Sequence, residues 1–184
     1  MKELSLNILD IAMNSVTAKS TLIRIDLNET EDVLDISISD DGCGMKSEMV
    51  ENVTSPFCTS RTTRKVGMGI PLFKMASEQT GGSFSIVSKH IDQFPENHGT
   101  TTRASFFKNH LDFTPLGDII STITTLIQGM GEKIDLVFTH KSDKFNICLD
   151  TRELRETLGG DIPLSTPDVL VWITEFLKEN YNIT

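Results

Sequence analysis

The sequence predicts an α+β protein, because two kinds of hydrophobic periodicity alternate along its 184 residues. Several segments place apolar residues every three to four positions, as one face of an α-helix does. Others alternate apolar and polar residues in pairs separated by short polar stretches, as antiparallel hairpins do. A chain of this length forms one ordinary domain with an appendage or two small domains, and we place a boundary at residue 110.

The first elements are a helix over residues 4–18 and a hairpin formed by strands 21–28 and 33–39. The helix has apolar residues on more than one face, which indicates considerable burial. It also places Asp10 and Asn14 one turn apart on a shared face. Asp and Asn are mediocre helix formers, so the pair is either the polar stripe of an amphipathic helix or a functional feature.

The second strand runs directly into Asp40-Asp41-Gly42-Cys43-Gly44. Asp and Gly are favoured turn residues, so a tight turn is one interpretation. A calcium loop is a poor alternative, because two of the positions that would supply ligands are glycine. A third interpretation is a nucleotide contact, since a carboxylate at a strand end can accept a hydrogen bond from the adenine amine. The glycines would let the backbone approach a flat ligand.

Residues 45–66 have little sustained periodicity, and we expect a mobile loop there. Gly67-Met68-Gly69 then opens a helix that runs to about Gln79 and is ended by Gly81-Gly82. Free N–H groups at such a helix start favour phosphate, although two glycines alone are weak evidence. Strands are expected over residues 83–89 and 100–108.

The remaining residues have helix and strand signals of their own. Residues 115–130 predict a helix with Pro115 in its first turn. Alternating segments centred on residues 136 and 147 predict a second hairpin. Residues 151–158 predict a short helix, and Thr166-Pro167 begins the last one. We therefore expect residues 111–184 to form a small α+β domain.

Composition excludes several classes of protein. The chain has 26 acidic and 17 basic residues and a formal net charge of −9, so it repels the phosphates of nucleic acids. Its apolar runs are too short for a membrane span, and its N-terminus lacks the order of a secretion signal. We expect a cytoplasmic protein without a membrane or nucleic acid partner. The odd set Cys43, Cys58 and Cys148 fits reduced thiols and gives no structural metal site.

Six short segments occur in an order that resembles one known family. They are, in sequence order, DIAMN, SDDGCG, SPFCTSR, VGMGI, GG and GTTTRASF. This order is similar to that of the GHKL ATPases, which include gyrase, MutL, histidine kinases, anti-sigma-factor kinases and the heat-shock chaperones of the ninety-kilodalton class. The resemblance covers residues 4–108. It implies a two-layer α/β sandwich of the histidine-kinase ATPase (Bergerat) type, with helices over one face of a mixed sheet. It also implies ATP or ADP and Mg²⁺ as ligands, bound between the helix layer and a lid.

The resemblance implies functions for Asp10 and Asn14 on the first helix. Asn14 matches the magnesium ligand of the family, and an amide oxygen together with phosphate oxygens suits Mg²⁺. Asp10 matches the glutamate that activates water, and we expect it to act as a general base. Asp is one methylene shorter than Glu, so its carboxylate would lie farther from the attacking water. This departure weakens the expectation of hydrolysis.

The resemblance also assigns the nucleotide-binding residues. At the base, it implies that Asp40 contacts adenine, Thr100 assists this contact, and Gly42 and Gly44 shape the pocket. At the phosphates, it implies a lining formed by Gly67, Met68 and Gly69. The phosphate charge would be neutralised by Arg61, Arg64 and Lys65. A solvated cationic loop is the alternative for the three basic residues. Lys65 departs from the family, because many kinases have a glycine there.

We therefore expect an ATP- and magnesium-binding regulatory protein whose lid reports the nucleotide state to a protein partner, with slow hydrolysis. Residues 111–184 would supply an interaction or homodimerisation surface. One alternative is a stand-alone kinase that phosphorylates a separate protein. A complete sensor kinase is not expected, because no histidine precedes the first helix. The other alternative is a scaffold that keeps the fold without nucleotide.

Overall fold

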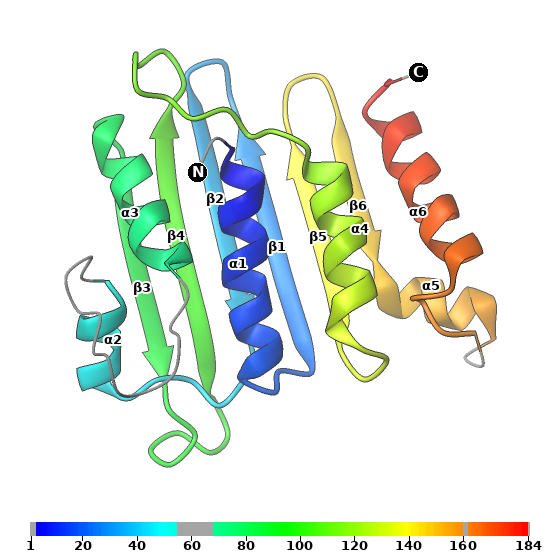
Figure 1. Ribbon diagram of the computed structural model, residues 1–184, viewed down its shortest axis with the longest axis horizontal. Helices are drawn as coiled ribbons and strands as arrows, with labels where there is room; N and C mark the ends of the chain where they lie inside the picture. Colours follow the sequence, from blue (N-terminus) through cyan, green and yellow to red (C-terminus); the bar gives the residue numbers. More distant parts are fainter. Residues whose placement is uncertain (1–2, 55–67, 160–161, 184) are drawn as a thin grey trace.

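The computed structural model describes residues 3–54, 68–159 and 162–183, and it contains one six-stranded sheet with the order β3-β4-β2-β1-β5-β6 (Figure 1). The strands are β1 (Leu22–Glu29), β2 (Val33–Asp40), β3 (Ser83–Lys89), β4 (Gly99–Phe107), β5 (Asp135–Lys141) and β6 (Asn146–Asp150). The helices are α1 (Leu4–Thr17), α2 (Ser47–Val53), α3 (Gly69–Gln79), α4 (Ile119–Met130), α5 (Thr151–Leu158) and α6 (Pro167–Asn180).

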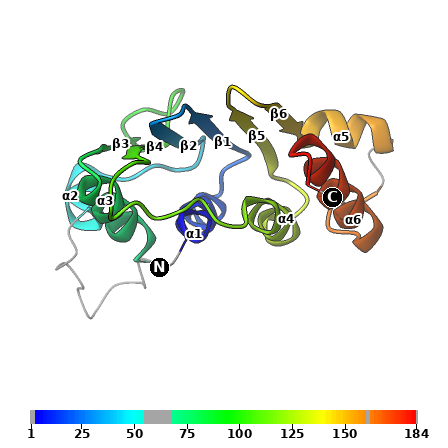
Figure 2. The same cartoon turned by 90° about the horizontal axis from the view of Figure 1, so that it is seen from above.

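The molecule has two layers. Helices α3, α1 and α4 lie side by side across one face of the sheet (Figure 2). Among the described residues, no helix covers the opposite face over the strands β3, β4, β2 and β1. Helices α5 and α6 lie at the β6 end. The expected α+β class and two-layer arrangement are confirmed.

The sheet is mixed, also as expected. β1 pairs antiparallel with β2, and β4 pairs antiparallel with both β2 and β3. On its other side β1 pairs with β5 in parallel, with Ile25 opposite Phe138, and β5 forms the second expected hairpin with β6. The sheet is therefore continuous across residue 110. The proposed division into two domains does not coincide with a break in the sheet, and it stays a prediction.

The core lies between the sheet and the helices. The strands alternate as the sequence pattern requires, so Ile23, Ile25 and Leu27 of β1 are buried between exposed polar neighbours. One apolar cluster contains residues from both halves of the chain. Its fully buried members include Leu4, Ile8, Ile36, Phe73, Phe106, Ile123, Leu136 and Phe138. Burial of these side chains attaches the helices to the sheet.

Two expected elements were wrong in part. Helix α2 lies inside residues 45–66, where we expected only a loop, because a two-turn helix anchored by buried Val53 is too short to show periodicity. Helix α4 begins at Ile119 rather than Pro115, because Asp118 caps it by accepting a hydrogen bond from the N–H of Ser121. The carbonyls of residues 115 and 116 instead accept hydrogen bonds from the first N–H groups of α1.

The other helices and strands occupy the predicted ranges to within two residues at most ends. In the part of the chain that the structure describes, no helix combines the length and apolar character needed to cross a bilayer.

Candidate functional site

Several of the predicted site residues come together at one end of the sheet. Asp40 is the last residue of β2, and it stands opposite Thr100 of β4 in the strand register. Helix α1 carries Asp10 and Asn14 over the same region, and α3 begins beside it at Gly69. The segments that supply these residues are far apart in sequence, and the sheet and the α1–α3 contact bring them together.

The Asp40 carboxylate is held in place by α1 and by its own turn. Ser15 donates a hydrogen bond of 2.7 Å to Oδ2, and the N–H of Gly42 donates one of 2.9 Å to Oδ1. Burial raises the pKa of Asp40 above its ordinary value, while the hydrogen bonds from Ser15, Gly42 and Thr100 act to lower it. Each carboxylate oxygen keeps lone-pair capacity for a ligand donor.

Thr100 belongs to a small hydroxyl cluster behind the Asp40 turn. Its Oγ1 lies 2.8 Å from Oγ of Ser88, which accepts a hydrogen bond of 2.7 Å from the N–H of Met45. Ser88 also donates to the carbonyl of Gly99. These bonds connect the ends of β3 and β4 to the turn that follows β2.

The glycines of that turn have no room for side chains. A Cβ on Gly42 would lie 2.8 Å from the Cβ of Ala18, and one on Gly44 would lie 2.0 Å from the carbonyl oxygen of Lys89. Gly44 also has a φ of +67°, which L residues rarely adopt. The turn is therefore packed closely between the end of α1 and the end of β3.

Helices α1 and α3 meet at Asp10. A Cβ on Gly69 would lie 2.7 Å from Oδ2 of Asp10, and Asn7 donates a hydrogen bond of 3.4 Å to the Gly69 carbonyl. Only a glycine lets the start of α3 approach this carboxylate so closely. Asn14 is half-buried one turn along α1, next to Ser15, and Met68 is 62% exposed at the N-cap of α3.

The comparisons with known proteins agree with this arrangement. Residues 1–113 match the family described as histidine kinase-, DNA gyrase B-, and HSP90-like ATPase. The chain belongs to this ATPase family. The match covers more than half of the sequence and contains every residue of the site described above.

Two further likenesses fit the ATPase family. The ATPase domain of Aquifex aeolicus MutL complexed with ADP superposes with a TM-score of 0.52 and 13% identity, over 86% of this chain and 70% of that one. This likeness concerns the fold alone. A putative sensor protein of Shewanella frigidimarina (strain NCIMB 400) is 27% identical over 89 residues, which are 48% of this chain. The chain spans 14% of the length of that relative.

The described residues fit a magnesium ion of the expected kind. Asn14 is half-buried and its side-chain amide makes no hydrogen bond within the described residues, so its oxygen is available as a hard ligand. No cluster of three or more His, Cys, Asp or Glu side chains suited to a metal occurs in residues 3–54, 68–159 and 162–183. A site completed by the phosphates of a nucleotide needs no such cluster.

Four of the predicted site residues lie outside the described residues: Arg61, Arg64, Lys65 and Gly67. Their expected contacts with phosphate stay predictions, as do the roles of Asp10, Asn14, Asp40, Gly42, Gly44, Met68, Gly69 and Thr100.

The sequence analysis missed three residues that hold the turn. Ser15 binds Asp40, and its place beside Asn14 was the only available signal. Asp41 accepts hydrogen bonds from the N–H groups of Thr21 and Leu22. Burial acts to raise the pKa of Asp41, but these bonds and that of the Thr21 hydroxyl outweigh it and lower the pKa. His98 places Nδ1 2.6 Å from the Gly42 carbonyl, and no local pattern could have indicated this contact.

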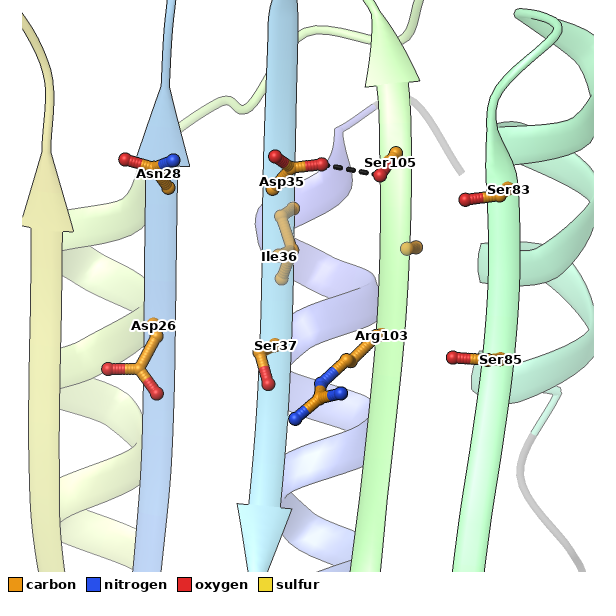
Figure 3. A pocket seen from close by; sticks show the side chains of 10 residues that line it. Asp26, Asn28, Asp35, Ile36, Ser37, Ser83, Ser85, Arg103 and Ser105 are labelled. Atoms are coloured by element: carbon orange, nitrogen blue, oxygen red, sulfur yellow. Dashed lines mark hydrogen bonds between the residues drawn. The ribbon is translucent and has the colours of Figure 1, made fainter.

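A hollow of about 310 Å³ on the open face of the sheet is separate from this site. Figure 3 shows its polar side chains in front of the strands, with the helices behind them. Arg103 reaches from β4 toward β2, and Ser105 donates a hydrogen bond to Asp35. The hollow is lined by none of the predicted site residues and lies on the face away from α1 and α3.

Proposed function

We propose that this protein is an ATP- and magnesium-binding regulatory protein whose nucleotide state is read by a protein partner. One observation carries the proposal. Helix α1 contacts both ends of the site, through the Ser15 bond to Asp40 and through the packing of Asp10 on Gly69. Membership of the ATPase family supports the assignment of this site to a nucleotide.

The base would bind at Asp40. Its carboxylate can accept a hydrogen bond from the exocyclic amine of adenine, because Ser15 and Gly42 use only part of its acceptor capacity. The same carboxylate would repel the carbonyl group that guanine has in place of this amine. Close packing of the Gly42–Gly44 turn gives the base a rigid wall.

The phosphates would bind toward α3 and Asn14. Helix α3 has 11 residues and no side-chain cap at its start, so its first N–H groups and its dipole favour an anion. When bound, Mg²⁺ neutralises phosphate charge, and the Asn14 amide oxygen would be its protein ligand. Arg61, Arg64, Lys65 and Gly67 are proposed to complete the phosphate site.

Slow hydrolysis is part of the proposal. The Asp10 carboxylate is short and packs against Gly69, which leaves it little freedom to approach a water beside the γ-phosphate. A protein that keeps ATP bound for long periods suits the signalling role. Residues 111–184 would provide the surface for the partner or for a homodimer.

Calorimetry with ADP and ATP, with and without Mg²⁺, tests the binding site. We expect wild type to bind ATP with Mg²⁺, and Asp40→Asn to bind at least about 30-fold more weakly, as expected for loss of a charged hydrogen-bond acceptor. Asp35→Asn is the matched control, because it makes the same change on the open face of the same strand. Equal affinities for Asp40→Asn and wild type would contradict the proposal.

Transfer of labelled γ-phosphate separates the remaining functions. Slow release of free phosphate supports the regulatory ATPase. Label on a separate protein would favour the kinase alternative. If the wild-type protein bound no nucleotide, the result would favour the alternative of a scaffold that keeps the fold without nucleotide.

A further inference from the structure

A second cavity of about 620 Å³ lies between α4 and α6, away from the nucleotide site. Ile23 of β1 stands opposite Asp40, whereas the cavity is lined by Glu29 six residues farther along that strand, roughly 20 Å away. Its apolar walls all come from residues after 110, including a residue next to the C-terminus. They are Leu116, Ile119, Ile120, Phe145 and Ile183.

The buried side chain of His140 forms hydrogen bonds with Glu29 and Tyr181 at this cavity. Nε2 of His140 lies 3.2 Å from the Glu29 carboxylate, and Nδ1 lies 2.7 Å from the Tyr181 hydroxyl. Burial lowers the pKa of His140, so the ring is neutral at pH 7. The carboxylate can only accept, hence Nε2 carries the proton and Tyr181 donates to Nδ1. The other oxygen of Glu29 binds Lys108 at 2.7 Å.

The hydroxyl groups around the cavity also donate their protons to acceptors within the protein. Ser121 donates to Asp118 at 2.6 Å, and Thr174 donates to the carbonyl of Leu170 at 2.8 Å. At the start of α4 the N–H groups of Asp118 and Ser121 bind carboxylates. The hydroxyl oxygens and the Asp118 carboxylate retain lone pairs, so the fixed polar groups of the lining are acceptors.

The charged and aromatic groups at the cavity also favour a cationic ligand. Hydrogen bonds from Ser121 lower the pKa of Asp118, which keeps it ionised at neutral pH. Lys178 is the one lysine or arginine among the described lining residues, and its charge also acts to lower the pKa of Asp118. Because Lys178 is exposed, water solvates its charge and its long stem can turn away. The rings of Phe145 and Tyr181 pack edge to face with centroids 5.1 Å apart and offer π surface to a cation.

We propose that the cavity between α4 and α6 binds a small apolar amine, with its hydrocarbon body on the isoleucine and aromatic walls and its ammonium group at Asp118 and the hydroxyl oxygens. Its volume lies within the range of small-molecule sites, which are mostly apolar with a few placed polar groups. The proposal does not depend on nucleotide binding at the other end of the sheet.

Two probes of the same shape and opposite charge test this site. They are 2-phenylethylamine and 3-phenylpropionate, added to the full chain without nucleotide and followed by calorimetry and by the NMR signals of His140 and Tyr181. We expect the amine to bind with a Kd below about 1 mM and to shift both ring signals. The acid should bind at least about tenfold more weakly. Equal or tighter binding of the acid, or no binding of the amine, overturns the proposal.

Variants locate the amine. Asp118→Asn keeps a good helix cap but removes the charge, and it should weaken amine binding about tenfold without weakening the acid. Asp112→Asn, on an exposed loop outside the cavity, is the matched control and should change neither. Tyr181→Phe keeps the ring, loses the acceptor oxygen and should also bind the amine more weakly. Unchanged amine affinity in both Asp118→Asn and Tyr181→Phe, with folding verified by thermal unfolding, overturns the proposal.

Discussion

Gly44 and Gly159 both have positive φ angles but different surroundings. Their φ angles are +67° and +81°, and a Cβ at Gly159 would meet nothing within 4 Å. At Gly44 it would lie 2.0 Å from the Lys89 carbonyl oxygen. Alanine substitutions at these two positions therefore separate the energetic cost of the backbone conformation from the cost of a steric clash.

We predict that Gly44→Ala is more destabilising than Gly159→Ala. Gly159→Ala should lower the free energy of unfolding by about 1 kcal/mol through the backbone alone. Gly44→Ala adds a clash with main chain and should cost about 2 kcal/mol more. Urea unfolding of both variants measures the difference, and nucleotide affinity should fall only in Gly44→Ala. Equal losses of stability would show that the turn relaxes freely.

His140 predicts how stability depends on pH. Because burial lowers its pKa in the folded state, the unfolded chain binds more protons between the folded pKa and the ordinary value of 6.5. This contribution to stability is therefore complete above pH 6.5 and is lost as pH falls toward the folded pKa. The slope for one proton cannot exceed about 1.4 kcal/mol per pH unit.

Urea unfolding of wild type and His140→Gln between pH 7.5 and 5 measures this contribution. The variant should be less stable at pH 7.5, because it disrupts the bonds to Glu29 and Tyr181. It should also show a shallower loss of stability on acidification. Parallel pH curves for the two proteins would exclude His140 as the titrating group.

At the scale of elements, the start of α4 depends on Asp118. The residue accepts hydrogen bonds from both the N–H and the hydroxyl of Ser121, and the chain before it runs along the first turn of α1. We predict that Asp118→Ala lowers the free energy of unfolding by about 1 kcal/mol, whereas Asp118→Asn changes it by only a few tenths. Urea unfolding compares the two. A similar loss in both would show that charge, rather than capping, stabilises the helix start.

Local patterns predicted most of the elements but not the start of α4. Periods of two and 3.6 identified the strands and the long helices, because each element buries one face. Pro115 suits a first helical turn, yet its carbonyl is used by Leu4 of α1, a contact between residues more than 100 positions apart. The motifs similarly suggested Asp40 and Gly69 as site residues, which stays a prediction, but they gave no sign of Ser15 or His98, whose partners are set by tertiary packing.

For the whole molecule, the decisive feature is the parallel pairing of β1 with β5. It joins residues 22–28 to residues 135–141, and no local pattern could predict which edge of the first hairpin would accept a distant strand. Through this pairing the first 110 residues and the rest share one sheet and one apolar cluster. Helix α1 contacts both α3, at the proposed nucleotide site, and α4, beside the second cavity.

This continuity predicts the behaviour of the fragment 1–110. Removing the rest exposes the edge of β1 and the surface of α1 that α4 covers. We predict that the fragment is less stable than the full chain by several kcal/mol and associates through the exposed edge. Urea unfolding and sedimentation measure both effects. A monomeric fragment with the unfolding midpoint of the full chain would instead establish residues 1–110 as an independent domain, since its stability would then owe nothing to β5 or α4.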